Sequence, residues 1–365
     1  MNFGTILWVA AGGTALTVAF LANWERPPVD SVQRGYRGVG IQQVYNPRTL
    51  AEQVPDNQVP ESPWELDPTY EGERAGDIYE NVQVLGDLND DEFNHYMAAI
   101  TEWVSPEQGC AYCHNEENYA DDSVYTKIVS RRMMQMTLEI NGNWQSHVQQ
   151  AGVNCYTCHR GNNVPEYLWF EDPHARSVGM GLLGNPAGQN KSDETAAYAS
   201  LPADPLQPFL LDDAGIRVQS DTALPEGNRQ SIKQTERTYS LMMHMSDSLG
   251  VNCTYCHNSR AWGDWEQSSP QRTTAWYGIR MTRALNQDYL EPLGVQYPPH
   301  RLGPLGDAPK VNCATCHQGA YKPLYGANMV ADYPYLAGEG QLPEPAPEQT
   351  AALDGKPLPD DAAQN

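Results

Sequence analysis

All eight cysteines of this chain stand in one short pattern, Cys-x-x-Cys-His, which occurs four times. Two thiols at this spacing can each form a thioether with a haem vinyl group, and the adjacent histidine is then placed under the iron as its proximal ligand. A zinc site or a disulfide framework would leave the four adjacent histidines unexplained. The pattern therefore predicts four covalently bound c-type haems, held by Cys110, Cys113 and His114, by Cys155, Cys158 and His159, by Cys253, Cys256 and His257, and by Cys313, Cys316 and His317.

The cysteine count also restricts what else the chain can contain. Since all eight cysteines belong to the four motifs, we expect no disulfide bond and no reactive thiol. Because c-type haems are attached outside the cytoplasm, we expect the bulk of the chain to be exported.

Each haem iron has a second axial position, and the residue there sets the chemistry. Methionine raises the potential, histidine lowers it, and an open position permits catalysis. The chain has 11 methionines, several of them ahead of the haem motifs. Five of its nine histidines lie outside the motifs, and these are His95, His147, His174, His244 and His300.

We expect a helix from Asp90 to about Val104, because an acidic first turn suits the helix dipole and an apolar face follows. Phe93, Met97, Ile100 and Val104 share that face. Met97 lies in the middle of it, shortly before Cys110, so a helix laid over the first haem would aim Met97 at the iron. The alternative is an ordinary core methionine.

Three further helices are expected ahead of the other motifs, over about 122–140, 229–248 and 273–290. On the first of them Met133 and Met136 share a face, and either could ligate the second haem. The other two helices also carry candidate ligands, which are Met242, Met243, His244 and Met245 for the third haem, and Met281 on the last helix.

The order of these elements predicts a mainly α fold with two pseudo-repeated two-haem units. Gly-Val-Asn precedes both Cys155 and Cys253, and Val-Asn precedes Cys313, which suggests an internal duplication. The expected organisation is a membrane anchor (1–24), an extended arm (25–80), a unit for haems 1 and 2 (81–170), a connector (171–227), a unit for haems 3 and 4 (228–337) and a disordered acidic tail rich in Pro and Ala (338–365).

The expected anchor is a run of 18 uncharged residues from Ile6 to Asn23. As a helix this run is about 27 Å long, close to the thickness of a bilayer core. Trp8 and Trp24 flank it as interfacial residues do. We therefore expect one retained N-terminal transmembrane helix, with a cleaved signal peptide as the alternative.

The charge balance bears on the partners. With 23 basic and 46 acidic side chains the formal charge is −23, which argues against nucleic acid because phosphates would be repelled. The same field would attract a cationic partner and speed its docking.

Taken together, these features resemble the tetrahaem cytochrome c subunit of the photosynthetic reaction centre of purple-type bacteria. The likeness rests on the Gly35-Tyr36-Arg37-Gly38 segment, the two-plus-two haem motifs and the methionine-bearing helices, and it covers nearly the whole chain. It implies a second axial ligand for each haem, which is Met97 for the first, Met133 for the second, Met242 for the third and His147 for the fourth. The alternatives for the fourth haem are His300 and Met281.

Many members of that family carry a lipidated cysteine after a signal peptide. In this sequence no cysteine precedes Cys110, so we expect attachment through the peptide itself.

The resemblance implies an electron-transfer subunit, not an enzyme, on the periplasmic face of the photosynthetic inner membrane. It would re-reduce the photo-oxidised bacteriochlorophyll special pair of the reaction centre core subunits, with electrons from a soluble cytochrome c or a high-potential iron–sulfur protein. One alternative is a membrane-anchored tetrahaem quinol dehydrogenase, which the methionine-rich helices disfavour. Another is a multihaem enzyme with an open haem, which needs an unfilled axial position and acid–base groups.

Overall fold

The part of the chain that carries all four haem motifs is continuous except for three gaps in its middle. The computed structural model describes residues 3–22, 29–33, 42–172, 193–202, 204–219 and 231–338. The Gly35-Tyr36-Arg37-Gly38 segment, His174, Trp24 and the acidic tail from 339 onwards lie outside these residues. The predictions made for them stay predictions.

Within the described residues the fold is mainly helical, as the sequence predicts. Four helices of 15 to 19 residues form the body: α4 (Asp90–Val104), α5 (Tyr125–Asn143), α8 (Ile232–Leu249) and α9 (Pro270–Ala284). The shorter α-helices are α2 (Pro47–Gln53), α3 (Ala75–Ile78), α6 (Gln145–Val148), α7 (Tyr156–His159) and α10 (Cys313–His317).

The remaining elements are single turns and one small sheet. Strands β1 (Asp30–Gln33) and β2 (Gln42–Tyr45) pair antiparallel, with Asp30 opposite Tyr45. The short 3₁₀ and π turns are η1 (Pro55–Asn57), η2 (Gly109–Tyr112), η4 (Glu194–Ala196), η5 (Gln207–Leu211), η6 (Cys253–Tyr255), η7 (Leu285–Leu290), η8 (Glu291–Gln296), η9 (Pro299–Arg301), η10 (Pro323–Gly326) and η11 (Pro334–Leu336).

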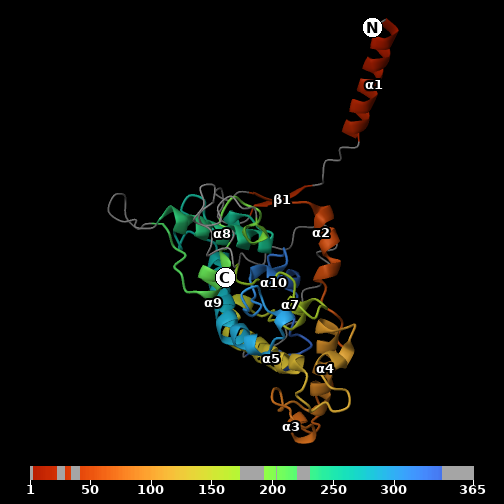
Figure 1. Ribbon diagram of the computed structural model, residues 1–365, viewed down its shortest axis with the longest axis vertical. Helices are drawn as coiled ribbons and strands as arrows, with labels where there is room; N and C mark the ends of the chain where they lie inside the picture. Colours follow the sequence, from red (N-terminus) through yellow and green to blue (C-terminus); the bar gives the residue numbers. More distant parts are fainter. Residues whose placement is uncertain are drawn as a thin grey trace.

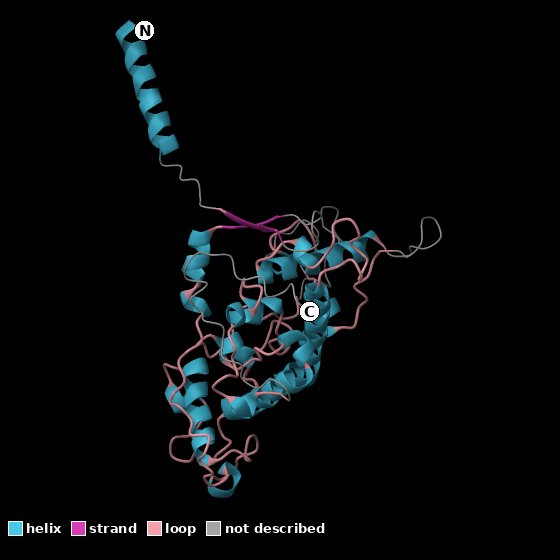
Figure 2. Cartoon of the chain, turned by 180° about the vertical axis from the view of Figure 1, so that it is seen from behind, coloured by secondary structure: helices cyan, strands magenta, loops and turns pink. Residues whose placement is uncertain are grey.

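The body tapers from a broad end, which carries α8 and β1, to a narrow end formed by α3 and α4 (Figure 1). Seen from behind, helices and loops make up nearly all of it, and the two strands lie at its edge (Figure 2). Helix α1 (Phe3–Ala22) forms where the sequence predicts the N-terminal helix, and it lies apart from the body. Among the described residues, no helix has both the length and the apolar character needed to cross a membrane. The predicted transmembrane span is therefore not confirmed.

Side-chain caps fix where two of the four long helices, α4 and α8, begin. At α4, Asn89 accepts the Glu92 N–H and Glu92 accepts the Asn89 N–H, which is a complete capping box. Ser231 and Gln234 form the same arrangement at α8. Helix α5 begins at Tyr125, later than the Asp122 that the sequence suggests, because the Asp122 carboxylate pairs with Arg131 and does not cap the helix.

The hydrophobic core contains a face of α4 that the sequence does not predict. The α4 residues buried most deeply are His95, Tyr96, Ala99 and Trp103, which pack with residues 330–336. The expected face with Met97 is only partly buried. The face with Met97, which we expect to lie over the first haem, stays a prediction, and two of its residues, Ile100 and Val104, line a large cavity. Aromatic side chains from the C-terminal part of the chain pack against the other face.

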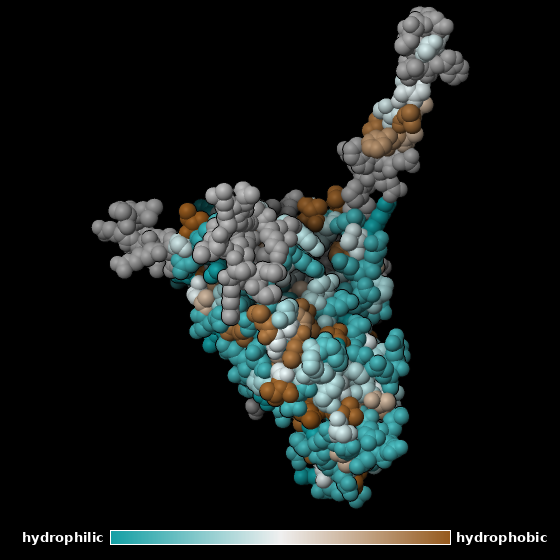
Figure 3. Space-filling model, in the orientation of Figure 1, coloured by the Kyte–Doolittle hydropathy of each residue, from teal (hydrophilic) through white to brown (hydrophobic). Residues whose placement is uncertain are grey.

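The predicted connector, 171–227, contributes to the core where it is described. Leu206, Phe209 and Leu210 are buried against Leu241 of α8 and Ile279 of α9. Arg283 and Asn286 bind backbone carbonyls of this segment. These residues therefore pack as part of the body. The face seen in Figure 3 is mostly hydrophilic, with apolar patches near the middle of the body.

Candidate haem-binding site

The four motif histidines are held in one way, by a hydrogen bond from Nδ1 to a backbone carbonyl. In the first and third motifs the acceptor lies five residues on: His114 donates to Tyr119 O (3.2 Å) and His257 to Trp262 O (3.0 Å). In the second and fourth it lies three residues on, at the carbonyls of Asn162 and Ala320, both at 2.9 Å from His159 and His317 respectively.

The shorter loop depends on a left-handed backbone. Arg160 and Gln318, directly after the motif histidines, have φ of 50° and 47°, and each is followed by a glycine with positive φ. This turn brings the carbonyl back to the ring. In the longer loop an aromatic residue lies beside the histidine instead, since the rings of His114 and Tyr119 are 5.1 Å apart.

These bonds fix the chemical form of each imidazole. A carbonyl can only accept a hydrogen bond, so Nδ1 carries the proton and the Nε2 lone pair is free to bind a metal. Burial lowers the pKa of all four motif histidines, most strongly for His317, where it reaches about 4. The rings are therefore neutral at pH 7, which is the form that binds iron.

The second and fourth motifs lie side by side, on α7 and α10. The Cα atoms of Cys158 and Cys316 are 4.4 Å apart, and a disulfide joins their sulfur atoms. This bond departs from the expectation that all eight cysteines belong to haem motifs and that none enters a disulfide. The reason is the contact between α7 and α10, which brings the two thiols within disulfide range. A thioether to haem would use the same sulfur atoms, so the two bonds exclude each other.

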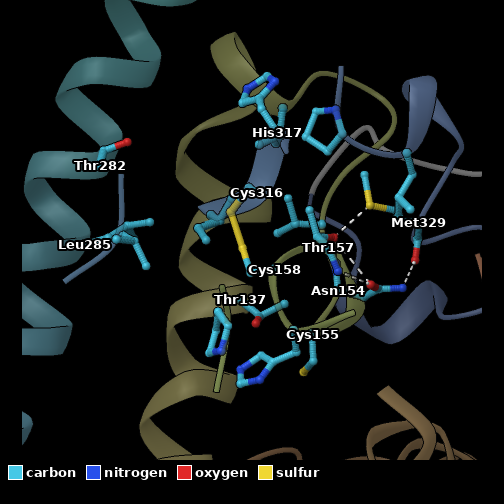
Figure 4. A pocket seen from close by; sticks show the side chains of 18 of the residues that line it. Thr137, Asn154, Cys155, Thr157, Cys158, Thr282, Leu285, Cys316, His317 and Met329 are labelled. Atoms are coloured by element: carbon cyan, nitrogen blue, oxygen red, sulfur yellow. Dashed lines mark hydrogen bonds between the residues drawn. A yellow bond between two sulfur atoms is a disulfide. The ribbon is translucent and has the colours of Figure 1, made fainter. Parts of the chain in front are cut away.

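A large cavity surrounds these two motifs (Figure 4). Its volume is about 1130 Å³, above the roughly 300–1,000 Å³ typical of a site for one small ligand. Asn154 and Thr157 fix one wall, because Asn154 Nδ2 donates to the Met329 carbonyl (3.0 Å) and Thr157 Oγ1 contacts the Met329 sulfur (2.7 Å). The motif residues that line the cavity are Cys155, Cys158, His159, Cys256, Cys313, Cys316 and His317.

His147 lies opposite His317 across this space. The two ring centroids are 6.0 Å apart. His147 Nδ1 donates to the Thr274 carbonyl on α9 (2.9 Å), which leaves its Nε2 free, and burial lowers its pKa. Gly278 of α9 makes the approach possible, since a Cβ there would lie 2.5 Å from His147 Cε1.

The geometry of the two rings fits a metal shared between them. Imidazole nitrogens bind metal ions at about 2.0–2.1 Å, so two rings that shared one metal on opposite sides would have centroids about 6 Å apart. The pair His147 and His317 meets this spacing. The cavity walls are largely apolar, as a porphyrin requires, and include Ile100, Val104 and Met133. The residues present therefore fit a haem at the fourth motif.

The methionines predicted as ligands lie in different surroundings. Met133 is partly buried and lines the cavity together with Met136. Met97 is partly buried beside the Tyr96–Trp103 cluster, and Met242 packs near Leu241 and Ile279. Neither Met97 nor Met242 lines the large cavity, whereas Met245, an alternative for the third haem, does.

The other candidate ligands make contacts elsewhere, except Met281, which also lines the large cavity. His95 uses both ring nitrogens, with Ser62 Oγ at 2.7 Å and Tyr335 Oη at 2.9 Å. His244 is buried and donates to the Thr195 carbonyl. His300 is exposed, and Met281 is buried among core side chains of the α5–α9 cluster.

Two buried asparagines fix the backbone that leads into the second and fourth motifs, and the sequence analysis identified neither. Asn141 donates to Val153 O and accepts from Val153 N, two residues before Cys155. Asn286 makes the same pair of bonds with Val311, two residues before Cys313. The signal available in the sequence was an asparagine directly after an Ile or a Leu, upstream of a Val-Asn-Cys run.

A chain with covalent haem attachment motifs, imidazoles fixed for metal binding and a large apolar cavity between them is a c-type cytochrome. The family model described as "Photosynthetic reaction centre cytochrome C subunit" matches residues 25–337. The chain is 54% identical to the photosynthetic reaction center cytochrome c subunit of Rubrivivax gelatinosus, over 92% of this chain and 88% of the relative. It is 52% identical to the same subunit of Thermochromatium tepidum, over 87% and 77%. A cytochrome c-554 of Chloroflexus aurantiacus is 28% identical, over 68% and 70%.

These matches cover most of the chain at high identity. The chain belongs to the family of photosynthetic reaction centre cytochrome c subunits.

Proposed function

We propose that this chain carries four covalently bound c-type haems and re-reduces the photo-oxidised special pair of a photosynthetic reaction centre. The observation that carries the proposal is the set of four motif histidines, each with Nδ1 committed to a carbonyl and Nε2 free. These histidines would hold a haem iron in both of its oxidation states, and the haem would supply one-electron chemistry there, which suits electron transfer and not substrate conversion.

We further propose thioethers from all eight motif cysteines, axial Met97, Met133 and Met242 for the first three haems, and His147 for the fourth. The spacing of His147 and His317 supports the last of these. The exposure of His300 disfavours it as an alternative, whereas Met281 lines the same cavity as His147 and His317 and stays one. The intact mass of the purified protein tests the attachment, because each haem adds its full mass whether one or two thioethers hold it, whereas a Cys158–Cys316 disulfide lowers the mass by the two hydrogens lost when it forms.

The two-unit organisation is also a proposal. The loops after the first and third motifs share the five-residue spacing of the histidine bond, and those after the second and fourth share the three-residue spacing. The bonds of Asn141 and Asn286 repeat in the same way. These likenesses support duplication of a two-haem unit.

The partners follow from the role. The reaction centre core would accept electrons, and a soluble cytochrome c or high-potential iron–sulfur protein would supply them at the periplasmic face. The formal charge of −23 favours a basic donor. Attachment through residues 1–24 rests on the uncharged run from Ile6 to Asn23. Removal of that segment, followed by alkaline extraction of membranes, tests it.

The decisive experiment is flash-induced absorbance change in photosynthetic membranes from a strain expressing the full chain. Haem oxidation within about a microsecond of a saturating flash is expected, since diffusional docking of a separate donor cannot compete on that time. Charge separation without any haem oxidation would refute the proposal. A quinol dehydrogenase would then be tested by quinol-dependent haem reduction.

A further inference from the structure

The carbonyl that holds the first motif histidine is shared with a cationic side chain. Tyr119 O accepts the His114 Nδ1–H at 3.2 Å and also a hydrogen bond from Lys127 Nζ at 2.7 Å. The bond to the ammonium is the shorter of the two. Since charged donors form stronger hydrogen bonds than neutral ones, the lysine is the dominant partner of this oxygen.

Lys127 is fixed in this position. It belongs to the first turn of α5, and only 7% of its surface is exposed. Its Nζ also donates to the Asp121 carbonyl (2.9 Å) and pairs with Asp122 Oδ1 (3.1 Å). Arg131 Nη1 binds the other Asp122 oxygen at 2.9 Å. The ammonium therefore has several fixed partners around the loop that carries Tyr119, and it cannot turn toward solvent without breaking all of them.

The other three motifs lack this arrangement in the described part of the chain. The carbonyls of Asn162, Trp262 and Ala320 accept from their histidines, and no charged side chain donates to them there. The third motif gives the closest comparison. Arg272 donates to Asp264 O, seven residues after His257, just as Lys127 donates to Asp121 O, seven residues after His114. Only the lysine reaches the carbonyl at the fifth position as well.

We propose that Lys127 is a positioning residue that raises the redox potential of the first haem through the Tyr119 carbonyl. A strong acceptor at Nδ1 gives the imidazole anionic character, and the added electron density stabilises ferric iron. An ammonium bound to the same carbonyl draws lone-pair density away from His114. The carbonyl is then a weaker acceptor for Nδ1–H, and the ferrous state of the haem is stabilised. This inference rests on the proposed ligation of the first haem by His114.

The expected effect follows from removing the ammonium while keeping an apolar side chain. In Lys127→Leu, the full acceptor strength of Tyr119 O returns to His114, so the ferric state is favoured. Loss of the hydrogen-bond partner of a metal ligand commonly changes metal affinity or activity by about tenfold or more. A tenfold shift of a one-electron equilibrium is a fall of about 59 mV. Lys127→Arg keeps a cationic donor and should restore most of the loss.

Redox titration of the purified holoprotein measures this, with the first haem identified by Met97→His. That variant should move one wave of the titration, that is, the midpoint potential of one haem. Lys127→Leu should lower the same midpoint potential and leave the other three in place. Arg131→Gln is the matched control, since Arg131 lies near His114 but donates to Asp122 and not to Tyr119 O. It removes a charge of the same sign and should shift the wave much less.

A second readout separates tuning from structural damage. In ferrous protein labelled with ¹⁵N-histidine, the Nδ1–H proton of His114 should move downfield in Lys127→Leu, because its hydrogen bond strengthens. The methionine-to-iron charge-transfer band of the ferric protein should keep its full intensity, because loss of Met97 would remove the share of one of the three proposed methionine-ligated haems.

The outcomes are distinguishable. An unmoved wave in Lys127→Leu, or equal shifts in Lys127→Leu and Arg131→Gln, overturns the inference and leaves the proposed function standing. If Met97→His moves no wave, the ligation in the proposed function fails instead.

Discussion

Replacement of Asn286 by alanine tests whether a single buried amide holds the fourth motif in place. This residue is fully buried at the junction of α9 and η7, and its side chain makes three hydrogen bonds. Nδ2 donates to Leu210 O (2.8 Å) and Val311 O (3.0 Å), and Oδ1 accepts from Val311 N (2.9 Å). Asn286→Ala removes all three and leaves an N–H and two carbonyls without these partners.

The free energy of unfolding that Asn286→Ala should lose follows from these three bonds. Each intramolecular hydrogen bond contributes about 1 kcal/mol net, so three amount to about 3 kcal/mol. The cavity left by the amide adds to this figure. Since about 1.4 kcal/mol is a tenfold change in an equilibrium constant, the unfolding constant should rise roughly a hundredfold.

Guanidinium unfolding of the holoprotein, followed by the Soret band and by far-ultraviolet circular dichroism, measures the change. The midpoint should fall while the slope stays constant. Asn143→Ala is the matched control, because this exposed asparagine makes one bond, to Glu139, and should stay within about 0.5 kcal/mol of the wild type. An Asn286→Ala midpoint equal to that of the control would refute the reasoning.

Three further predictions follow from the same contacts. His147→Met should raise the potential of one haem and leave the others unchanged in a redox titration, because a thioether replaces an imidazole as axial ligand; four unmoved waves would contradict this. Gly278→Ala should shift that same wave, since its Cβ would lie 2.5 Å from His147 Cε1, whereas Gly142→Ala, which meets nothing within 4 Å, should not. Arg131 holds the pKa of Asp122 well below its usual 3.8. The stability that this carboxylate contributes is therefore complete above pH 3.8, and it is lost only as the pH falls through the lowered pKa. Acid titration of unfolding should show this contribution missing in Asp122→Asn at every pH, and an identical acid profile for both proteins would argue against it.

The sequence predicted the haem motifs and the long helices because both depend on local patterns. Four Cys-x-x-Cys-His units need no tertiary information, and the capping residues Asn89 and Ser231 mark helix starts directly. The start of α5 was misplaced because Asp122 forms an ion pair with a residue two turns ahead. Long-range pairing of this kind overrides a local capping signal.

What could not be predicted from spacing alone is which distant groups meet. His147 entered through a family resemblance, and its place opposite His317 depends on how α9 packs against α6, with Gly278 leaving room for the ring. The contact of Cys158 with Cys316 likewise joins residues 158 positions apart. The deeply buried face of α4 could not be predicted either, because Tyr333 and Leu336, far along the chain, supply its partners.

The packing of the C-terminal residues against the first half has a consequence for the order of folding. Tyr333 lies against Trp103 with ring centroids 4.6 Å apart, Leu336 O accepts from Asn141, and Met329 N donates to Ala151 O. In a chain made from its N-terminus, the first two motifs precede these partners by more than a hundred residues. The core of the first half therefore stays incomplete until residues 329–336 are made. Packing of residues 329–336 then completes that core, so the last part of the fold to form lies against the second motif.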